Sequence, residues 1–323
     1  MAYVMPQGAP FRRGKFLWEL AMNVASDPAT PQNGDRELCI AVGSGSGDAF
    51  RPLFRMATGS PLLAHAIMRR EIEMAVVNPS ALLTQAYRGV GFFKEKLPLR
   101  VVAVYPSWDR FAFLFHRRTG VKSLKDVRDR KLPLRISLRQ DPTHASRIFI
   151  DQALSYYGFG LDDLESWGGT LVKSVRPADA IRMNPIRDGE LDAIWDEGLS
   201  GWFAPSMRNG FDPIDIEPDH FDYLATLGWR KASIPVGLWD MTYEHWCIDF
   251  SGWPLYAHES LPDDIAYRVA ASVEMRKDHI SWEEDYTGPE QLFMDTEATP
   301  FDAPLHPGAQ KFLDELRARA PAG

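Results

Sequence analysis

The stretch "ELCIAVGSGSGDAF", residues 37–50, decides how the first part of the chain is interpreted. The apolar run Leu38–Val42 predicts a buried strand, and a loop of glycine and serine follows it. Helical spacing of apolar residues from Phe50 to Arg70, broken at Gly59, Ser60 and Pro61, predicts helix after the loop. A helix N-terminus offers free N–H groups and a partial positive charge, so such a loop can hold an anion. We therefore expect three loop residues to contact an anionic ligand: Ser44, Gly45 and Ser46.

The rest of the chain alternates between strand and helix patterns. Short apolar runs predict strands at residues 73–78, 99–106, 111–116, 134–138 and 191–195. Most of these runs are followed by a segment with helical spacing, and Ser123 is placed to cap one such helix. This alternation indicates an α/β fold with parallel sheets. A chain of 323 residues suits two lobes of about 150 residues each.

Composition excludes several classes of function. The chain is 45% hydrophobic and 25% charged, which is ordinary for a globular protein. Its net charge of -8 provides no basic surface, so we expect no nucleic-acid partner. No segment reaches the roughly 18 apolar residues of a membrane span, so we expect no membrane insertion. Cys39 and Cys247 have no metal-type spacing, and we expect neither a metal nor another cofactor.

The N-terminus predicts a cytoplasmic protein for the sequence as it stands. Residues 1–10 carry no basic residue, and the first apolar run is interrupted by Glu19 and Asn23, so it does not fit a secretory signal. Its apolar residues recur at helical spacing and predict one amphipathic helix. This helix either covers the first lobe or joins two chains into a homo-oligomer, and the sequence does not separate these roles.

Six phrases, collinear from about residue 37 to the end, resemble one protein family. They are "IAVGSGSGDAFRPL", "EMAVVNPSALLTQAYRG", "LRVVAVYPSWDRFAFLFHRRTGVKSLKDV", "RDGELDAIWDEG", "LPDDIAYRV" and "PLHPGAQKF". Together they resemble the TAXI-type solute-binding proteins associated with TRAP transporters. Each phrase alone is weak evidence, whereas six in order are a fairly specific signal.

The resemblance implies a type II periplasmic-binding-protein fold, in which two α/β lobes enclose a ligand cleft and two crossover strands form the hinge. It places the crossovers near Phe111–His116 and Trp253–His258, and it implies a small carboxylate as ligand. The expected division is a helical extension and linker over 1–36, lobe 1 from 37–112 and 255–323, and lobe 2 from 113–254.

The departures from the family pattern weigh against transport. The family is exported, whereas the N-terminus here does not read as a signal. The Gly/Ser-Gly-Thr loop that opens the family's second lobe is replaced by "LRQDPTHASR". The small apolar turn after the "Asp-Ala" strand is replaced by Trp195, Asp196, Glu197 and Gly198.

Ligands of open α/β sheets bind at the carboxyl ends of the strands, which selects the candidate site residues. Arg139 suits a carboxylate because its planar fork binds both oxygens, unless it is only a surface arginine. His144 is either a catalytic base in the first turn of a helix or a structural hydrogen-bonding group. Glu197 either delivers a proton or latches the lobes. The remaining expected ligand contacts are Asn78, Ser80, Trp108, Thr143, Trp195 and Trp239.

Two functions follow from these residues. The first is a cytosolic TAXI-like protein that binds a small mono- or dicarboxylate, with or without an aromatic ring, by lobe closure. The alternative is a cytosolic, cofactor-free decarboxylase, that is a carboxy-lyase, of an aromatic or small dicarboxylate on the same scaffold. In that case His144 or Glu197 would be the proton donor.

Overall fold

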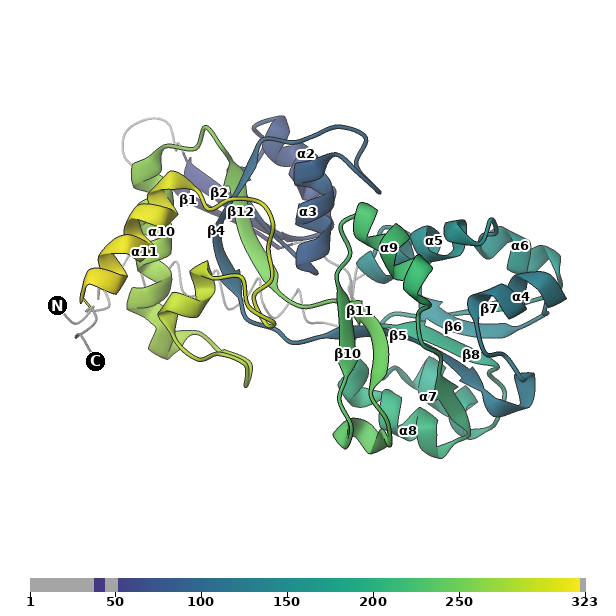
Figure 1. Cartoon of the computed structure of the whole chain (residues 1–323). Coiled ribbons are helices and arrows are strands. Elements are labelled where there is room, and N and C mark those ends of the chain that lie inside the picture. Colours follow the sequence, from purple (N-terminus) through teal and green to yellow (C-terminus); the bar gives the residue numbers. More distant parts are fainter. Residues whose placement is uncertain (1–37, 44–51, 320–323) are drawn as a thin grey trace.

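The computed structural model describes residues 38–43 and 52–319, and this part of the chain forms two α/β lobes (Figure 1). The sheet of lobe 1 has the strand order β1-β2-β3-β12-β4. Strands β2 and β3 are parallel, whereas β12 runs antiparallel to both β3 and β4. The bounds are β1 Leu38–Gly43, β2 Pro52–Gly59, β3 Met74–Val77, β12 Trp253–His258 and β4 Leu99–Tyr105.

The helices of lobe 1 lie on both faces of this sheet (Figure 1). Helices α2 and α3 pack on the face that carries Ala75 and Val101, and α10 packs on the face of Met74 and Val102. Helix α11 packs against α10. The bounds are α2 Leu63–Met68, α3 Ser80–Arg88, α10 Asp263–Arg276 and α11 Pro307–Arg319, with 3₁₀ turns η4 Lys277–His279 and η5 Pro289–Phe293.

The sheet of lobe 2 has the order β10-β11-β5-β8-β6-β7, and β9 pairs with β5. Strands β6, β7 and β8 are parallel, and β5 runs antiparallel to β8 and to β11. The bounds are β10 Lys231–Ile234, β11 His245–Asp249, β5 Arg110–His116, β8 Ala193–Asp196, β6 Arg135–Arg139, β7 Thr170–Ser174 and β9 Phe211–Pro213.

Helices again cover both faces of the second sheet. One face packs against α5, and the other packs against the segment from α7 to α8. The helices are α4 Leu124–Arg130, α5 Ala145–Tyr156, α6 Leu161–Ser166, α7 Ala180–Arg187, α8 Phe203–Arg208 and α9 Pro218–Thr226, and the 3₁₀ turns are η1 Arg117–Thr119, η2 Leu199–Gly201 and η3 Leu238–Asp240.

Two short crossings join the lobes. The chain leaves lobe 1 between β4 and β5 through residues 106–109, and it returns between β11 and β12 through residues 250–252. The strand after each crossing is inserted between strands of the lobe that it enters, β5 between β11 and β8, and β12 between β3 and β4. This arrangement is the type II periplasmic-binding-protein fold. The sheets are mixed, not purely parallel, because these inserted strands run against their neighbours and because the edge strands β1 and β10 are also antiparallel to theirs.

The expectation of a helix over Phe50–Arg70 is wrong for most of that range. Residues 52–59 form β2, and only Leu63–Met68 is helical. Closely spaced apolar residues fit the periodicity of a helix as well as that of a strand. The strand forms here because the backbone of β2 pairs with β1 on one side and with β3 on the other. Among the described residues, the first element after the glycine-serine loop is therefore a strand. The predicted ligand contacts Ser44, Gly45 and Ser46 lie outside the described residues.

Most other predicted elements are confirmed, and their ends follow from particular residues. Strand β3 and helix α3 lie where the sequence indicates, and α3 ends at Gly89, which has φ 69°. Ser123 caps α4, accepting from the backbone N–H of Asp126 in a capping box. These signals are local, so they are readable without knowledge of the tertiary contacts.

One apolar core continues from lobe 1 into lobe 2. It includes Leu82 on α3 as well as Phe149 on α5. Beside it, the side-chain amides of Gln85 and Gln152 exchange two hydrogen bonds, of 3.0 and 3.1 Å, and Trp229 Nε1 donates to Gln152 Oε1 at 2.6 Å. Buried contact of this kind restrains the movement of one lobe relative to the other.

The contact between lobes is tested by two alanine substitutions. Gly228 has φ +92°, and a Cβ there would lie 3.0 Å from Thr84 Cγ2 of α3, whereas Gly158, with φ +74°, has no heavy atom within 4 Å of that position. Both substitutions incur the strain of a left-handed residue, about 1–2 kcal/mol. We expect Gly228→Ala to lower the free energy of unfolding further, because the new Cβ crowds the Thr84 side chain of the other lobe. Urea denaturation measures this, and equal losses would contradict the interlobe contact.

Candidate functional site

A buried ion cluster lies at the carboxyl ends of β6 and β8. The carboxylate of Asp196 contacts Arg139 Nε at 3.0 Å and Arg182 Nη1 at 2.6 Å, and it accepts a hydrogen bond from Ser146 Oγ at 3.0 Å. Burial alone would raise the pKa of Asp196, but Arg182 and then Arg139 lower it below its ordinary value. Asp196 is therefore an ionised carboxylate held between two guanidinium groups.

Arg139 also pairs with the next carboxylate along the chain, Glu197. Its Nη1 donates to the Val175 carbonyl at 2.6 Å. Arg182 is equally occupied, donating to Ser137 and Ser174 hydroxyls at 2.9 Å each. The cluster thus joins β6, β7, β8 and α7, and its hydrogen bonds are directed within lobe 2.

Asp109, the last residue of the first crossing, places its carboxyl group against Glu197. The backbone N–H of Gly198 donates to both Asp109 oxygens at 3.1 Å, and the N–H of Arg110 donates to Oδ1 at 2.7 Å. The backbone N–H of Asp109 itself donates to Ser251 Oγ at 3.0 Å, on the second crossing. Asp109 therefore links both crossings to the end of β8.

The charges of the cluster balance without Asp109. Two guanidinium groups face two carboxylates, those of Asp196 and Glu197. Burial, and then the negative charge of Glu197, raises the pKa of Asp109 well above its ordinary value. The protonated form of Asp109 is favoured, and in that form its O–H can donate to an anion or deliver a proton.

Trp108, which precedes Asp109 in the chain, packs against a second tryptophan, Trp239. The ring centroids of Trp108 and Trp239 are 5.9 Å apart, and Phe203 packs on Trp239 at 5.8 Å. Trp239 and Asp240 have φ values of 50° and 69°, a conformation uncommon outside glycine. Strained backbone of this kind concentrates at ligand sites. Both tryptophans are half-buried.

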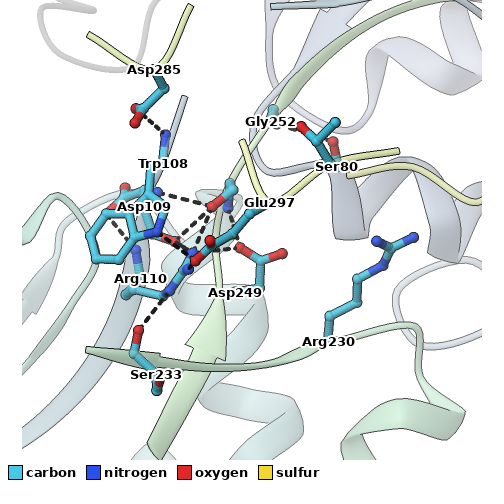
Figure 2. Close-up of polar contacts among 12 residues, drawn as sticks. Ser80, Trp108, Asp109, Arg110, Arg230, Ser233, Asp249, Gly252, Asp285 and Glu297 are labelled. Atoms are coloured by element: carbon cyan, nitrogen blue, oxygen red, sulfur yellow. Dashed lines mark hydrogen bonds and ion pairs between the residues drawn. The ribbon is translucent and has the colours of Figure 1, made fainter. Parts of the chain in front are cut away.

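Arg110 contacts residues of both crossings and of the C-terminal segment (Figure 2). Its side chain is buried, and Nη1 donates to Asp249 Oδ1 at 2.9 Å and to Ser251 Oγ at 2.8 Å. Its guanidinium lies 4.1 Å from the Trp108 ring centroid and also pairs with Glu297. This stacking orients Trp108.

A C-terminal segment of lobe 1 spans the hinge. Trp108 donates from its backbone N–H to Asp285 at 3.0 Å and from Nε1 to Glu297 at 2.8 Å (Figure 2). Farther along, Arg230 of lobe 2 pairs with Asp295 at 2.7 Å and with Asp302 at 2.6 Å. Residues 285–302 therefore connect the first crossing to lobe 2.

A small pocket lies between the lobes at the hinge, and Ser80, Arg230 and Asp249 belong to its lining (Figure 2). Its volume is about 10 Å³, which is the size of one water molecule. Ser80 Oγ donates to the Gly252 carbonyl at 3.2 Å, and Arg230 is already paired. A larger ligand at this pocket requires the lobes to move apart.

Three of the predicted site residues, Arg139, His144 and Glu197, are brought together. His144 is the N-cap of α5: its Nδ1 accepts from the Ser146 N–H at 3.2 Å, and the Ser146 hydroxyl in turn donates to Asp196. The guanidinium of Arg139 contacts Asp196, Glu197 and the Val175 carbonyl. Its role in this structure is therefore to hold the cluster together. Glu197 is a partner of both Arg139 and Asp109.

The other predicted contacts are dispersed. Trp195 is fully buried against Phe113 and Phe115, which is a core position. Thr143 bonds Asp141 locally, through its N–H at 2.7 Å. Asn78 is exposed and precedes α3. Trp108 and Trp239 lie together at the hinge, as described above.

Asp109 and Arg182 were not predicted as site residues. The only available signal for Asp109 was an acidic residue between two predicted strands, in "YPSWDRFAF". Arg182 lies on a helix whose exposed neighbours give no hint that this arginine is fully buried.

No family model matches the sequence, and no curated protein matches it. Solved structures with a similar fold include the periplasmic sulfonate-binding protein SsuA from Methylobacillus flagellatus, with 10% identity over 80% of each chain and a TM-score of 0.36. Lactococcal OpuAC complexed with glycine betaine has 9% identity over 80% of this chain and 82% of that chain, with a TM-score of 0.37. XAC2383 from Xanthomonas citri bound to ATP has 12% identity over 79% and 80%, with a TM-score of 0.38. Because these values are low, the fold assignment rests on the strand topology.

Within residues 38–43 and 52–319, no helix is long and apolar enough to cross a bilayer. The same residues contain no group of three or more His, Cys, Asp or Glu side chains arranged to hold a metal ion.

The buried ion cluster predicts a large loss of stability when Arg182 on helix α7 is substituted. Arg182→Gln leaves Asp196 with one guanidinium fewer in a fully buried site, and breaking such a cluster costs about 3–5 kcal/mol. Arg187→Gln on the same helix is the control, because Arg187 is exposed and its loss should change stability by about 0.5 kcal/mol or less. Chemical denaturation distinguishes them, and a small loss for both would refute the role of the cluster.

Proposed function

We propose that this protein binds a small carboxylate that carries an aromatic ring, in the interlobe cleft beside Asp109 and the Trp108–Trp239 pair. The observation that carries the proposal is that Asp109, whose carboxyl group has a raised pKa, directly follows Trp108 in the chain, and that the Trp108 ring packs against that of Trp239. One end of that site suits an anion and the other suits an aromatic ring.

The anionic end is supported by the charge balance. The cluster around Asp196 is neutral as a unit, so a ligand carboxylate meets no net negative charge there once Asp109 is protonated. A neutral carboxyl O–H that donates to a carboxylate forms a short, charge-assisted hydrogen bond. A ligand carboxylate is thus a suitable acceptor for Asp109.

The aromatic end is supported by ring geometry. Trp108 and Trp239 are tilted by 59° to each other, so a third ring can pack edge-to-face or offset against either. The six phrases that resemble the TAXI family support a binding protein of that kind. A cytosolic location and a homo-oligomer stay predictions.

The proposal is tested by calorimetric titration of the purified full chain with benzoate and phthalate. Succinate tests the need for a ring, and benzamide, which keeps the ring but lacks the negative charge, tests the need for an anion. We expect benzoate or phthalate to bind more tightly than both comparison compounds. Equal affinity for benzamide, or no binding of any carboxylate, would overturn the proposal.

Trp239→Ala should weaken binding of the aromatic carboxylate about tenfold, because it removes a ring contact worth about 1 kcal/mol together with buried area. Trp246→Ala is the matched control: Trp246 is 38% exposed on β11 and pairs with Lys231 instead of the hinge. Titration of both variants gives the two affinities. If Trp246→Ala weakens binding as much as Trp239→Ala does, the hinge tryptophans are not the site.

The raised pKa of Asp109 also favours a second function. Asp109 in its protonated form is a proton donor, which a carboxy-lyase needs. The carbon–carboxylate bond breaks, carbon dioxide leaves, the electron pair stays on the carbon, and that carbon takes the proton of Asp109, which solvent then replaces.

Incubation with phthalate distinguishes the two functions. A carboxy-lyase releases carbon dioxide and benzoate, and this release stops in Asp109→Asn while binding remains. A binding protein returns phthalate unchanged. Release that persists in Asp109→Asn would exclude Asp109 as the proton donor.

A further inference from the structure

We propose that a second ligand site lies within lobe 2, in a cavity bordered by α9, β10 and β11, and that it binds a short zwitterionic peptide with apolar side chains. The cavity has a volume of about 970 Å³, at the upper end of the range for small-molecule sites. Every residue that lines it lies between Phe115 and Trp246, so neither crossing contributes to it. The inference does not depend on the function proposed for the hinge.

Much of the lining of this cavity is apolar or aromatic. Ile214 and Ile216 are buried, and Phe221 belongs to the same apolar core. Two aromatic side chains of the lining are well exposed, Tyr243 at 44% and Trp246 at 38%. Exposed aromatic surface beside buried apolar residues is typical of ligand sites. Apolar side chains of a ligand can cover these rings.

Two carboxylates of the lining are fixed in position, and each leaves one oxygen open. Asp215 Oδ1 contacts His245 Nδ1 at 2.7 Å and accepts from the Trp246 backbone N–H at 2.9 Å. Glu217 Oε2 accepts from the Tyr157 hydroxyl at 2.6 Å. The other oxygens, Asp215 Oδ2 and Glu217 Oε1, accept no hydrogen bond from the residues that the structure describes. They can accept from a ligand ammonium group, which forms a charge-assisted hydrogen bond.

The contact with His245 keeps Asp215 ionised. Because that hydrogen bond favours the charged form, it lowers the pKa of Asp215 below its ordinary value. An ionised carboxylate only accepts hydrogen bonds, so Nδ1 of His245 carries the proton. The His245 side chain is fully buried, which holds the Asp215 carboxylate in its orientation. Asp215 is therefore a fixed, negatively charged acceptor at the edge of the cavity.

The lining also carries two lysines without an ionic partner. Lys231 lies over the rings of Trp246 and Phe221, with Nζ 3.9 and 5.1 Å from their centroids. In the described part of the chain, neither Lys231 nor Lys122 lies within 4.0 Å of a carboxylate oxygen. Both ammonium groups are thus open to a ligand carboxylate.

The balance of charge selects a zwitterion. Arg117 and Asp212, also in the lining, neutralise each other through two bonds of 2.9 and 2.7 Å. Two carboxylates and two lysines then remain, so a ligand with one sign of charge meets like charges as well as opposite ones. A short peptide carries an ammonium group and a carboxylate at its ends, with apolar side chains between them. A single amino acid carries the same charges but is small for a cavity of this volume.

The test is calorimetric titration of the full chain with leucyl-leucine, its N-acetyl derivative and its C-terminal amide. Leucyl-leucine has no aromatic ring, so the hinge tryptophans do not favour it. Acetylation removes the ammonium charge, and amidation removes the carboxylate charge. We expect each modification to weaken binding about fivefold, as the loss of one partly exposed ion pair does.

Two variants assign each end of the peptide to its partner. Lys231→Gln should weaken leucyl-leucine about fivefold and leave the amide unchanged, because the amide has no carboxylate for Lys231 to bind. Glu217→Gln should weaken leucyl-leucine but not the N-acetyl derivative, and its side-chain oxygen can still accept from Tyr157. Lys311→Gln is the matched control, because Lys311 lies over the Tyr267 ring at 5.5 Å, outside the cavity.

Trp239→Ala separates this site from the hinge and should leave the affinity for leucyl-leucine unchanged. Loss of that affinity in Trp239→Ala would place the peptide at the hinge and overturn the proposal. Failure of leucyl-leucine to bind, equal affinity for all three compounds, or equal weakening of all three by Lys231→Gln would overturn it as well. The titrations with benzoate and phthalate decide the hinge site separately, because neither compound carries an ammonium group.

Discussion

The carboxylate of Asp196, held between the guanidinium groups of Arg139 and Arg182, is the interaction on which the rest of the site depends. It joins neighbouring strands and α7 in a place that water does not reach. Because both guanidinium groups are committed there, Glu197 is fixed on Arg139 and turned towards the first crossing. The acid chemistry at Asp109 is therefore a consequence of a structural ion cluster at the end of β8, the strand that pairs with β5.

A second constraint is the shared core between the lobes. The reciprocal amide pair of Gln85 and Gln152 and the pairs of Arg230 lie on the same hinge that carries Trp108 and Asp109. Movement of the lobes therefore changes the surroundings of the carboxyl pair. Ligand entry, lobe separation and the proton at Asp109 are expected to be coupled, because one set of residues serves all three.

Local sequence signals predicted much of the fold. Apolar runs located β3 and β6, and capping residues such as Ser123 and Gly89 located helix ends. Strand β2 was missed because its identity is decided by pairing with two other strands. The site was predicted only in part: Arg139 and Glu197 were selected, but the partners of Arg139 lie 57 and 58 residues away, and no local pattern reveals such pairing. Asp109 escaped for the same reason, since its pKa depends on a neighbour from another strand.

The measurement that tests the account most directly is native mass spectrometry of the full chain purified from its own host. The account predicts one small aromatic carboxylate per chain, and a clearly lower fraction of chains that carry it in Trp239→Ala. A ligand without a carboxylate, or an aromatic carboxylate retained in full by Trp239→Ala, would contradict the central claim that the hinge tryptophans and the adjoining carboxyl pair form the binding site.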